Sequence, residues 1–197
     1  VTGRYAIARF NLEARGRPSH AGARLSEGRS AINLMARKLI EIEAMTTEDC
    51  TFSVGVMHGG QWVNCVPLSC RAEALSMAKQ QADLDQAVDR MLALSEATNE
   101  VSFMVTRGVT RPVWEPDAKC LAVYELARDL ARSLGWDLAH ESAGGGSDAN
   151  FTGAMGVTSL DGLGACGEGF HTLNEHIRLD CLVPRAGLLA GLLATLH

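Results

Sequence analysis

The sequence predicts a protein of the α/β class, with a ferredoxin-like antiparallel four-stranded sheet and two helices, followed by a partial α/β segment. Over roughly the first hundred residues, the hydrophobic spacing changes in the order strand, helix, strand, strand, helix, strand, which is the order of the ferredoxin-like unit. After that unit, strand-like and helix-like segments alternate. The chain has 197 residues, of which 47% are apolar, so it can bury a substantial core.

Each element of the first unit follows from its spacing. Apolar and polar residues alternate in the strands, whereas in the helices apolar residues recur every three or four positions. The expected strands cover residues 5–14, 52–56, 70–78 and 101–105, and the expected helices cover residues 29–45 and 81–96. A turn at Gly59-Gly60 and an extended link over residues 63–67 join the second and third strands. The helix residues expected to face the core are Ile32, Met35, Leu39, Ile42, Leu84, Val88, Met91 and Leu92.

The second half has a different character. A helix over residues 118–134, apolar over much of its circumference, is expected to end at Gly135. The remaining expected elements are strands at 136–140 and 157–160 and helices at 147–154 and 183–196. Because two strands make a poor sheet, and because the chain begins at Val1 rather than at an initiator Met, we expect an upstream part to be missing.

Composition excludes several classes of function. The chain has 18 Lys and Arg residues against 23 Asp and Glu residues, with no run of five like charges, so nucleic acid and anionic membranes are poor candidate partners. Its six cysteines form no CxxC pair, which favours reduced thiols and a cytoplasmic location, with the periplasm as the alternative. No apolar run approaches the ~18 residues of a membrane span.

Two glycine-rich turns carry the candidate chemistry. Gly144, Gly145 and Gly146 precede an expected helix, where they form either an anion cradle or a tight loop capped by Ser147 or Asp148. Neither a Walker loop nor a dinucleotide fingerprint is complete. Of six histidines, His20 and His171 lie in turns that contain Gly or Ser, where an imidazole can face a cleft. No histidine pair has metal-ligand spacing, and no serine lies in a nucleophile elbow.

Five motifs occur together in one order along the chain. They are Arg17-Pro18-Ser19-His20-Ala21-Gly22, Gly59-Gly60 with residues 63–67, Gly144-Gly145-Gly146-Ser147-Asp148-Ala149-Asn150-Phe151, His171-Thr172-Leu173-Asn174-Glu175, and Leu182-Val183-Pro184-Arg185. This series resembles the M20 zinc metallopeptidase family, most of all its glutamate carboxypeptidase-like branch, over nearly the whole chain. The resemblance implies that residues 5–110 are the dimerisation (lid) domain and that residues 111–197 are the C-terminal portion of the catalytic domain.

The resemblance also implies a chemistry and a set of roles. In the family, two zinc ions bridged by water and a carboxylate hydrolyse an amide, with a glutamate as general base. His171 would be a terminal zinc ligand, and His20 would reach across a homodimer to stabilise the oxyanion in the partner's site. The substrate, a small peptide or N-acyl amino acid, would be held by Asn64 from the lid, by Arg111 clamping its carboxylate, and by the backbone of Gly144, Gly145 and Gly146.

The chain departs from the family pattern in two ways. Met77 stands thirteen residues after Asn64, where the family commonly has arginine, which puts a strict preference for glutamate in doubt. The other zinc ligands and the general base belong to an N-terminal half that these residues do not contain. We therefore expect part of a zinc-dependent carboxypeptidase or amidohydrolase, inactive alone. The alternatives are a related deacylase, of the succinyl-diaminopimelate or acetylornithine type, and a non-catalytic dimerisation module.

Overall fold

The computed structural model describes residues 1–196, which divide into two compact units. The sheet unit consists of Tyr5–Val113 together with Gly144–Gly146. The helical unit consists of Val1–Arg4, Trp114–Ala143 and the chain from Ser147 onward. The triple glycine therefore belongs to the sheet unit, although Trp114–Ala143 of the helical unit lie between it and the rest of the sheet unit in the sequence.

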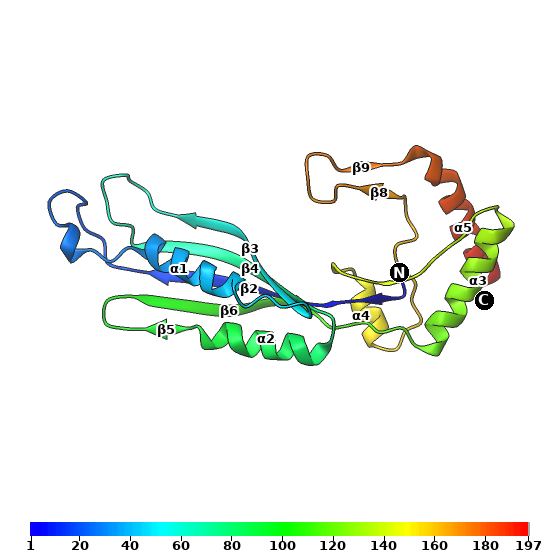
Figure 1. Ribbon diagram of the computed structural model, residues 1–197, viewed down its shortest axis with the longest axis horizontal. Coiled ribbons are helices and arrows are strands. Elements are labelled where there is room, and N and C mark those ends of the chain that lie inside the picture. Colours follow the sequence, from blue (N-terminus) through cyan, green and yellow to red (C-terminus); the bar gives the residue numbers. More distant parts are fainter. Residues whose placement is uncertain (197) are drawn as a thin grey trace. The chain divides into compact units, whose positions relative to one another are not determined.

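The sheet unit contains a five-stranded antiparallel sheet in the order β3-β4-β2-β6-β5. Its strands are β2 (Ala6–Arg15), β3 (Cys50–Gly59), β4 (Ser69–Ala78), β5 (Glu96–Ala97) and β6 (Ser102–Arg111). Two helices, α1 (Ala31–Glu43) and α2 (Gln81–Ala93), lie over the same face of the sheet (Figure 1). The predicted ferredoxin-like arrangement is confirmed, with β5 as a short addition at one edge.

The core of the sheet unit lies between the sheet and its two helices. Alternate residues of β2, including Phe10 and Leu12, face this core, and α1 begins where the Ser30 side chain accepts a hydrogen bond from the Asn33 amide. The prediction was wrong for two helix residues, because Ile32 is 36% exposed and Leu92 is 38% exposed. The buried helix positions that the prediction missed are Ala31, Leu34 and Ala87.

The helical unit is built on α3 (Ala118–Ser133) and α5 (Leu182–Thr195), with a short α4 (Ala149–Ala154). Its strands are β1 (Gly3–Arg4) parallel to β7 (Ser142–Ala143), and β8 (Gly167–Glu168) antiparallel to β9 (His176–Ile177). The predicted strands at 136–140 and 157–160 are wrong. Trp136, Leu138 and Leu160 instead pack against the core between α3 and α5, so their apolar spacing reflects burial without strand pairing.

Short 3-10 turns complete the fold, at η1 (Leu25–Glu27) in the sheet unit and at η2 (Leu179–Cys181) ahead of α5. Among residues 1–196, none of the helices has the length and apolar character needed to cross a membrane.

Candidate active site

The loop that carries His20 is held by close backbone approach. The chain leaves β2 at Gly16, where a Cβ atom would lie 1.9 Å from the carbonyl oxygen of Arg29, so only glycine fits. Immediately afterwards, Arg17 and Arg29 exchange backbone hydrogen bonds of 2.9 and 2.8 Å. These contacts close the base of the loop that carries His20.

A second pair of backbone hydrogen bonds brings His20 and Asn64 into neighbouring positions. The Ala21 amide donates to the Asn64 carbonyl at 3.0 Å, and the Val66 amide donates to the Ser19 carbonyl at 2.9 Å. The loop after β2 and the loop after β3 therefore pair as a short antiparallel ladder. Both His20 and Asn64 remain exposed, so their side chains are accessible to another molecule.

The backbone also selects the tautomer of His20. The Nδ1 atom accepts hydrogen bonds from the amides of Gly22 and Ala23, each at 3.1 Å. An amide can only donate, so in the neutral ring the proton must be on Nε2. The outward-facing atom of His20 is thus a hydrogen-bond donor.

A second group of predicted residues gathers at the opposite end of the sheet. A Cβ atom on Gly146 would lie 2.7 Å from Cδ of Arg111, and the Gly145 amide donates to Sδ of Met77 at 3.2 Å. Gly145 also has a φ of +80°, which favours glycine. The triple glycine and Arg111 are therefore neighbours, with Met77 packed against the same turn.

One chain does not bring the two groups together. In the β2–β6 register Arg111 pairs with Ile7, whereas His20 follows the other end of β2, beyond Arg15. The eight residue steps from Ile7 to Arg15 span about 26 Å at the usual rise of a strand. His20 and Asn64 therefore lie at one end of the sheet, and Arg111 and the glycines at the other.

His171 lies in the turn between β8 and β9 of the helical unit. Its φ of 62° makes it the one residue other than glycine with positive φ within residues 1–196. The His171 amide donates to Oε2 of Glu175 at 3.3 Å, and the imidazole is exposed. The turn thus holds the histidine in a conformation that side chains rarely adopt, and residues with such strain concentrate at functional sites.

The residues that the structure describes do not fit a complete zinc site. Catalytic zinc is usually held by three protein ligands, and among residues 1–196 no three His, Cys, Asp or Glu side chains are grouped for metal binding. His171 is available as one ligand only. His58, His140 and His176 belong to no such group, and His197 lies outside the described residues.

Two features of this region were missed by sequence reasoning. The contact between Met77 and Gly145 joins residues 68 positions apart, and no local pattern signals such a contact. The β8–β9 hairpin has strands of two residues each, too short for a period-two pattern. Gly167 and Gly169 on either side of Glu168 were the available signal for it.

Comparison with known proteins identifies the sheet unit. Residues 2–101 match the family model described as "Peptidase dimerisation domain" of the M20 type. Among curated proteins, the chain is 27% identical over 185 residues to "Uncharacterized protein YqjE" of Bacillus subtilis (strain 168), covering 90% of this chain and 48% of that protein. It is also 25% identical over 200 residues to "Carboxypeptidase G2" of Pseudomonas sp. (strain RS-16), covering 96% of this chain and 47% of that protein.

Solved peptidase structures also resemble this chain. A tripeptidase from Staphylococcus aureus subsp. aureus mu50 superposes with a TM-score of 0.76 at 25% identity, covering 98% of this chain and 52% of that one. The chain thus spans about half the length of the curated relatives it matches. The match to carboxypeptidase G2 supports the predicted glutamate carboxypeptidase-like branch at low identity. With a dimerisation-domain match over half of its residues, the chain belongs to the M20 peptidase family.

Proposed function

We propose that this chain is part of a hydrolase that cleaves an amide bond beside a free carboxylate, in a small peptide or an N-acyl amino acid. Peptidases among the similar proteins support this proposal. The chain would contribute the lid and the C-terminal portion of the catalytic domain to a longer protein. A glutamate carboxypeptidase-like activity is the specific form that we propose.

The observation that carries the proposal is the separation of His20 from Arg111 along β2. Arg111 has the bidentate geometry that binds a substrate carboxylate, and the backbone of the triple glycine would line the same pocket. His20 offers an Nε2–H donor suited to a developing oxyanion, with Asn64 beside it to hold the substrate. Only a second copy of the chain could bring His20 and Asn64 to the Arg111 end of its partner.

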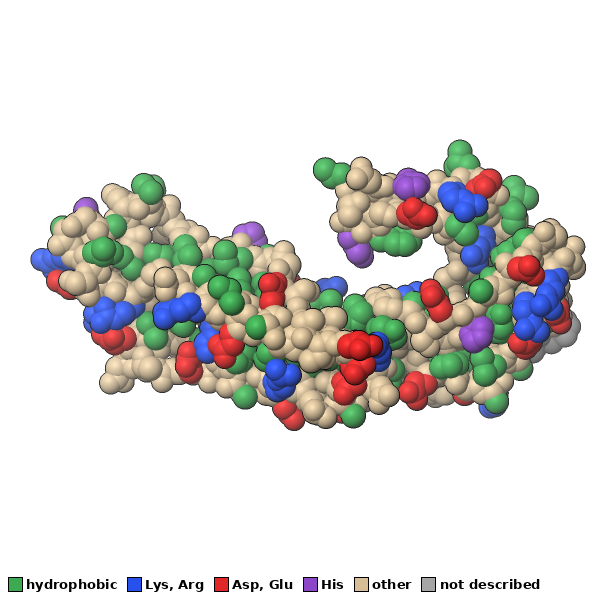
Figure 2. Space-filling view, in the orientation of Figure 1, with side chains coloured by type: hydrophobic (Ala, Val, Ile, Leu, Met, Phe, Trp, Pro, Cys, Tyr) green, Lys and Arg blue, Asp and Glu red, His purple; other side chains and the backbone are tan. Residues whose placement is uncertain are grey.

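The proposed homodimer would use the β3 edge of the sheet. β3 pairs with β4 on one side only, and α1 lies against it. Apolar side chains are exposed on both elements, with Ile32 and Ile40 on α1 and Val56 and Met57 on β3. Figure 2 shows hydrophobic side chains at the surface over α1 and the sheet beside it. An unpaired edge beside an exposed apolar helix face favours association with a second copy.

Zinc is the metal generally used by the M20 family, and we propose His171 as one of its terminal ligands. The remaining ligands and the general base would come from outside this chain. The 197-residue chain should accordingly be inactive alone.

The proposal is tested by assaying the complete protein encoded by the same gene against peptidyl- and N-acyl-glutamates, succinyl-diaminopimelate and acetylornithine. We expect the complete protein to hydrolyse the peptidyl- and N-acyl-glutamates, and the 197-residue chain to hydrolyse none of these substrates. His20→Ala and Arg111→Ala should each lower kcat/KM at least about a hundredfold. The exposed Arg132 on α3 provides the control, since Arg132→Ala should leave activity unchanged.

Preferred cleavage of succinyl-diaminopimelate or acetylornithine would assign the deacylase function instead. Activity on no substrate, with His20→Ala behaving as wild type in every assay, would favour the non-catalytic dimerisation module.

A further inference from the structure

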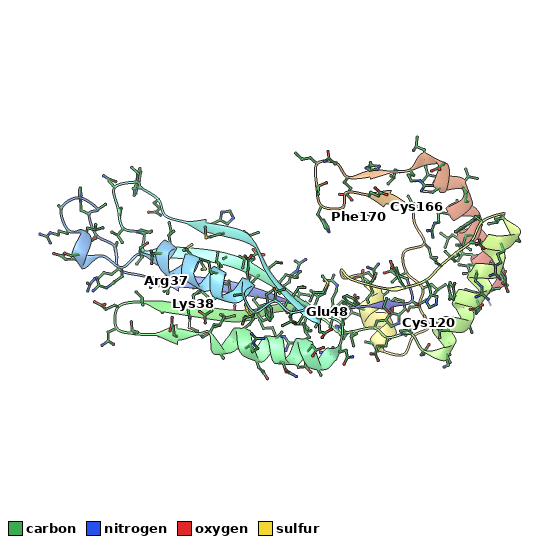
Figure 3. The ribbon with its side chains drawn as sticks, in the orientation of Figure 1. Arg37, Lys38, Glu48, Cys120, Cys166 and Phe170 are labelled. Carbon is green, nitrogen blue, oxygen red and sulfur yellow. The ribbon has the colours of Figure 1, made fainter. Side chains whose placement is uncertain are left out.

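Two cysteines meet at the base of the β8–β9 hairpin, outside the proposed roles. Cys166 immediately precedes β8, and the Arg178 amide donates to the Cys166 carbonyl at 2.9 Å, which extends the hairpin beyond its last strand pair. Cys181 closes η2 and is the N-cap residue of α5. Figure 3 shows Cys166 beside the N-terminal end of α5. The fold therefore brings together two thiols that are fifteen residues apart.

The side chain of Cys181 folds back over the open end of the hairpin. Its Sγ atom accepts a hydrogen bond from the Cys166 amide at 2.9 Å and donates one to the Arg178 carbonyl oxygen at 2.9 Å. The same sulfur lies 3.8 Å from the Cys166 carbonyl oxygen. A sulfur this close to the backbone of the other cysteine needs only side-chain rotation to approach its thiol.

The surroundings of Cys166 favour its thiolate. A hydrogen bond from Arg185 lowers the pKa of the Cys166 thiol against the opposing effect of burial, and the contact with Cys181 lowers it further. Arg185 is itself stacked over the Trp136 ring, with 5.2 Å between the guanidinium carbon and the ring centre. By contrast, burial raises the pKa of the Cys70 and Cys120 thiols. A partly exposed thiol beside arginine is the kind that reacts.

We propose that Cys166 and Cys181 form a reversible dithiol–disulfide site that is oxidised by small-molecule disulfides. The Cys166 thiolate attacks one sulfur of the small disulfide, which forms a mixed disulfide and expels one thiolate. Cys181 then loses its proton and attacks the Cys166 sulfur, which expels the second thiolate. Two electrons pass from the cysteines to the reagent, and the two protons end on the two released thiols. The new bond ties together the two ends of the hairpin that carries His171.

The test uses the 197-residue chain and oxidised glutathione as the small disulfide. After incubation and acid quenching, the intact mass should fall by two hydrogen masses, and peptide mapping should show Cys166 linked to Cys181. The loss should reverse with reduced glutathione. In the reduced chain, iodoacetamide should label Cys166 at least about tenfold faster than Cys70.

Matched variants locate the site. Cys166→Ser should abolish the internal disulfide, Cys181→Ser should stop the reaction at a glutathione adduct on Cys166, and Arg185→Gln should slow labelling of Cys166. Cys65→Ser, at the other partly exposed cysteine, should change none of these results. Peptide mapping of the wild-type chain needs no variant to fold. Persistent glutathione adducts without an internal link, a link between other cysteines, or equal labelling of Cys166 and Cys70 would each overturn the proposal.

Discussion

At the scale of single residues, the two candidate histidines are held by their own backbone rather than by burial. His20 is oriented by two amides on its Nδ1 atom, and His171 by a turn that imposes positive φ. Both imidazoles are exposed. The order of the motifs was enough to propose these residues from the sequence. The tautomer of His20 and the backbone strain at His171 depend on conformation, which the sequence alone does not report.

The positive φ of His171 predicts that stability and function respond differently to substitution. His171→Gly should leave the free energy of unfolding unchanged or raise it by up to about 1 kcal/mol, because glycine adopts this conformation without strain. His171→Val should lower it by about 1–2 kcal/mol, since β-branched residues tolerate positive φ poorly. Urea unfolding of the chain measures both values. Equal destabilisation by the two variants would show that the turn is not strained.

Asp161 predicts an acid-sensitive contact in the helical unit. Burial opposes its ionisation, but hydrogen bonds from Ser147, the Gly162 amide and Arg4 outweigh burial and lower its pKa below the ordinary 3.8. The Arg4–Asp161 ion pair measures 2.8 Å. A carboxylate with a lowered folded-state pKa stabilises the fold above its ordinary pKa, and this contribution is lost as the pH falls through the lowered value.

Asp161→Asn should therefore be destabilising near neutral pH, by about 1–3 kcal/mol for a partly buried charged hydrogen-bond network. The difference in the free energy of unfolding between this variant and the wild type should shrink below pH 3.8. Urea midpoints across this range provide the measurement. Asp137→Asn, at a side chain that is 96% exposed, should have little effect at any pH. If the destabilisation by Asp161→Asn stayed constant with pH, Asp161 would not be the carboxylate that stabilises the fold through a lowered pKa.

At the scale of elements, the sequence predicts best where one spacing continues over a whole strand or helix. β2, β4, α1 and α2 agree with their expected ranges to within a few residues because each buries one continuous face. β6 runs six residues beyond the expected 101–105, because its pairing with β2 continues past a register shift between Ala8 and Phe10. A continuation that depends on the partner strand has no local signature.

Close packing of α4 against Trp114 gives a prediction at this scale. A Cβ atom on Gly153 would lie 2.1 Å from Cδ1 of the Trp114 ring, which is buried and cannot easily move. Gly153→Ala should therefore lower the free energy of unfolding by about 1–3 kcal/mol through overpacking. At Gly164 an added Cβ atom meets nothing within 4 Å, so Gly164→Ala should be neutral or slightly stabilising. Chemical denaturation compares the two, and equal effects would contradict the packing argument.

At the scale of the whole molecule, the candidate site could be predicted from the sequence only as a set of residues. Their grouping depends on strand register, which places Arg111 opposite Ile7 and leaves His20 beyond the far end of β2. The pairing of the His20 and Asn64 loops likewise depends on contacts between residues more than forty positions apart. Single-sequence spacing does not report such contacts.

The proposed dimer surface predicts a selective effect of charge on association. Ile40→Glu on α1 should weaken self-association of the chain at least about tenfold, because a carboxylate would be buried in an apolar interface. Leu193→Glu on α5 is the matched control, since both side chains are 73% exposed. Sedimentation velocity over a concentration series measures the dissociation constant. A chain that stays monomeric throughout, or equal weakening by both variants, would refute this surface.

The proposed sharing of the active site between two copies predicts complementation between inactive variants of the complete protein. His20→Ala and His171→Ala should each be inactive, but in a mixed dimer one site receives an intact His20 and retains an intact His171. Random exchange in an equal mixture makes about half the dimers mixed, each with one working site of two, so about a quarter of wild-type activity should return. If His20 served its own chain, every site would lack one group and no activity would return. We expect activity to return, because about 26 Å of β2 separates the sheet end that carries His20 from the end that carries Arg111 in one copy.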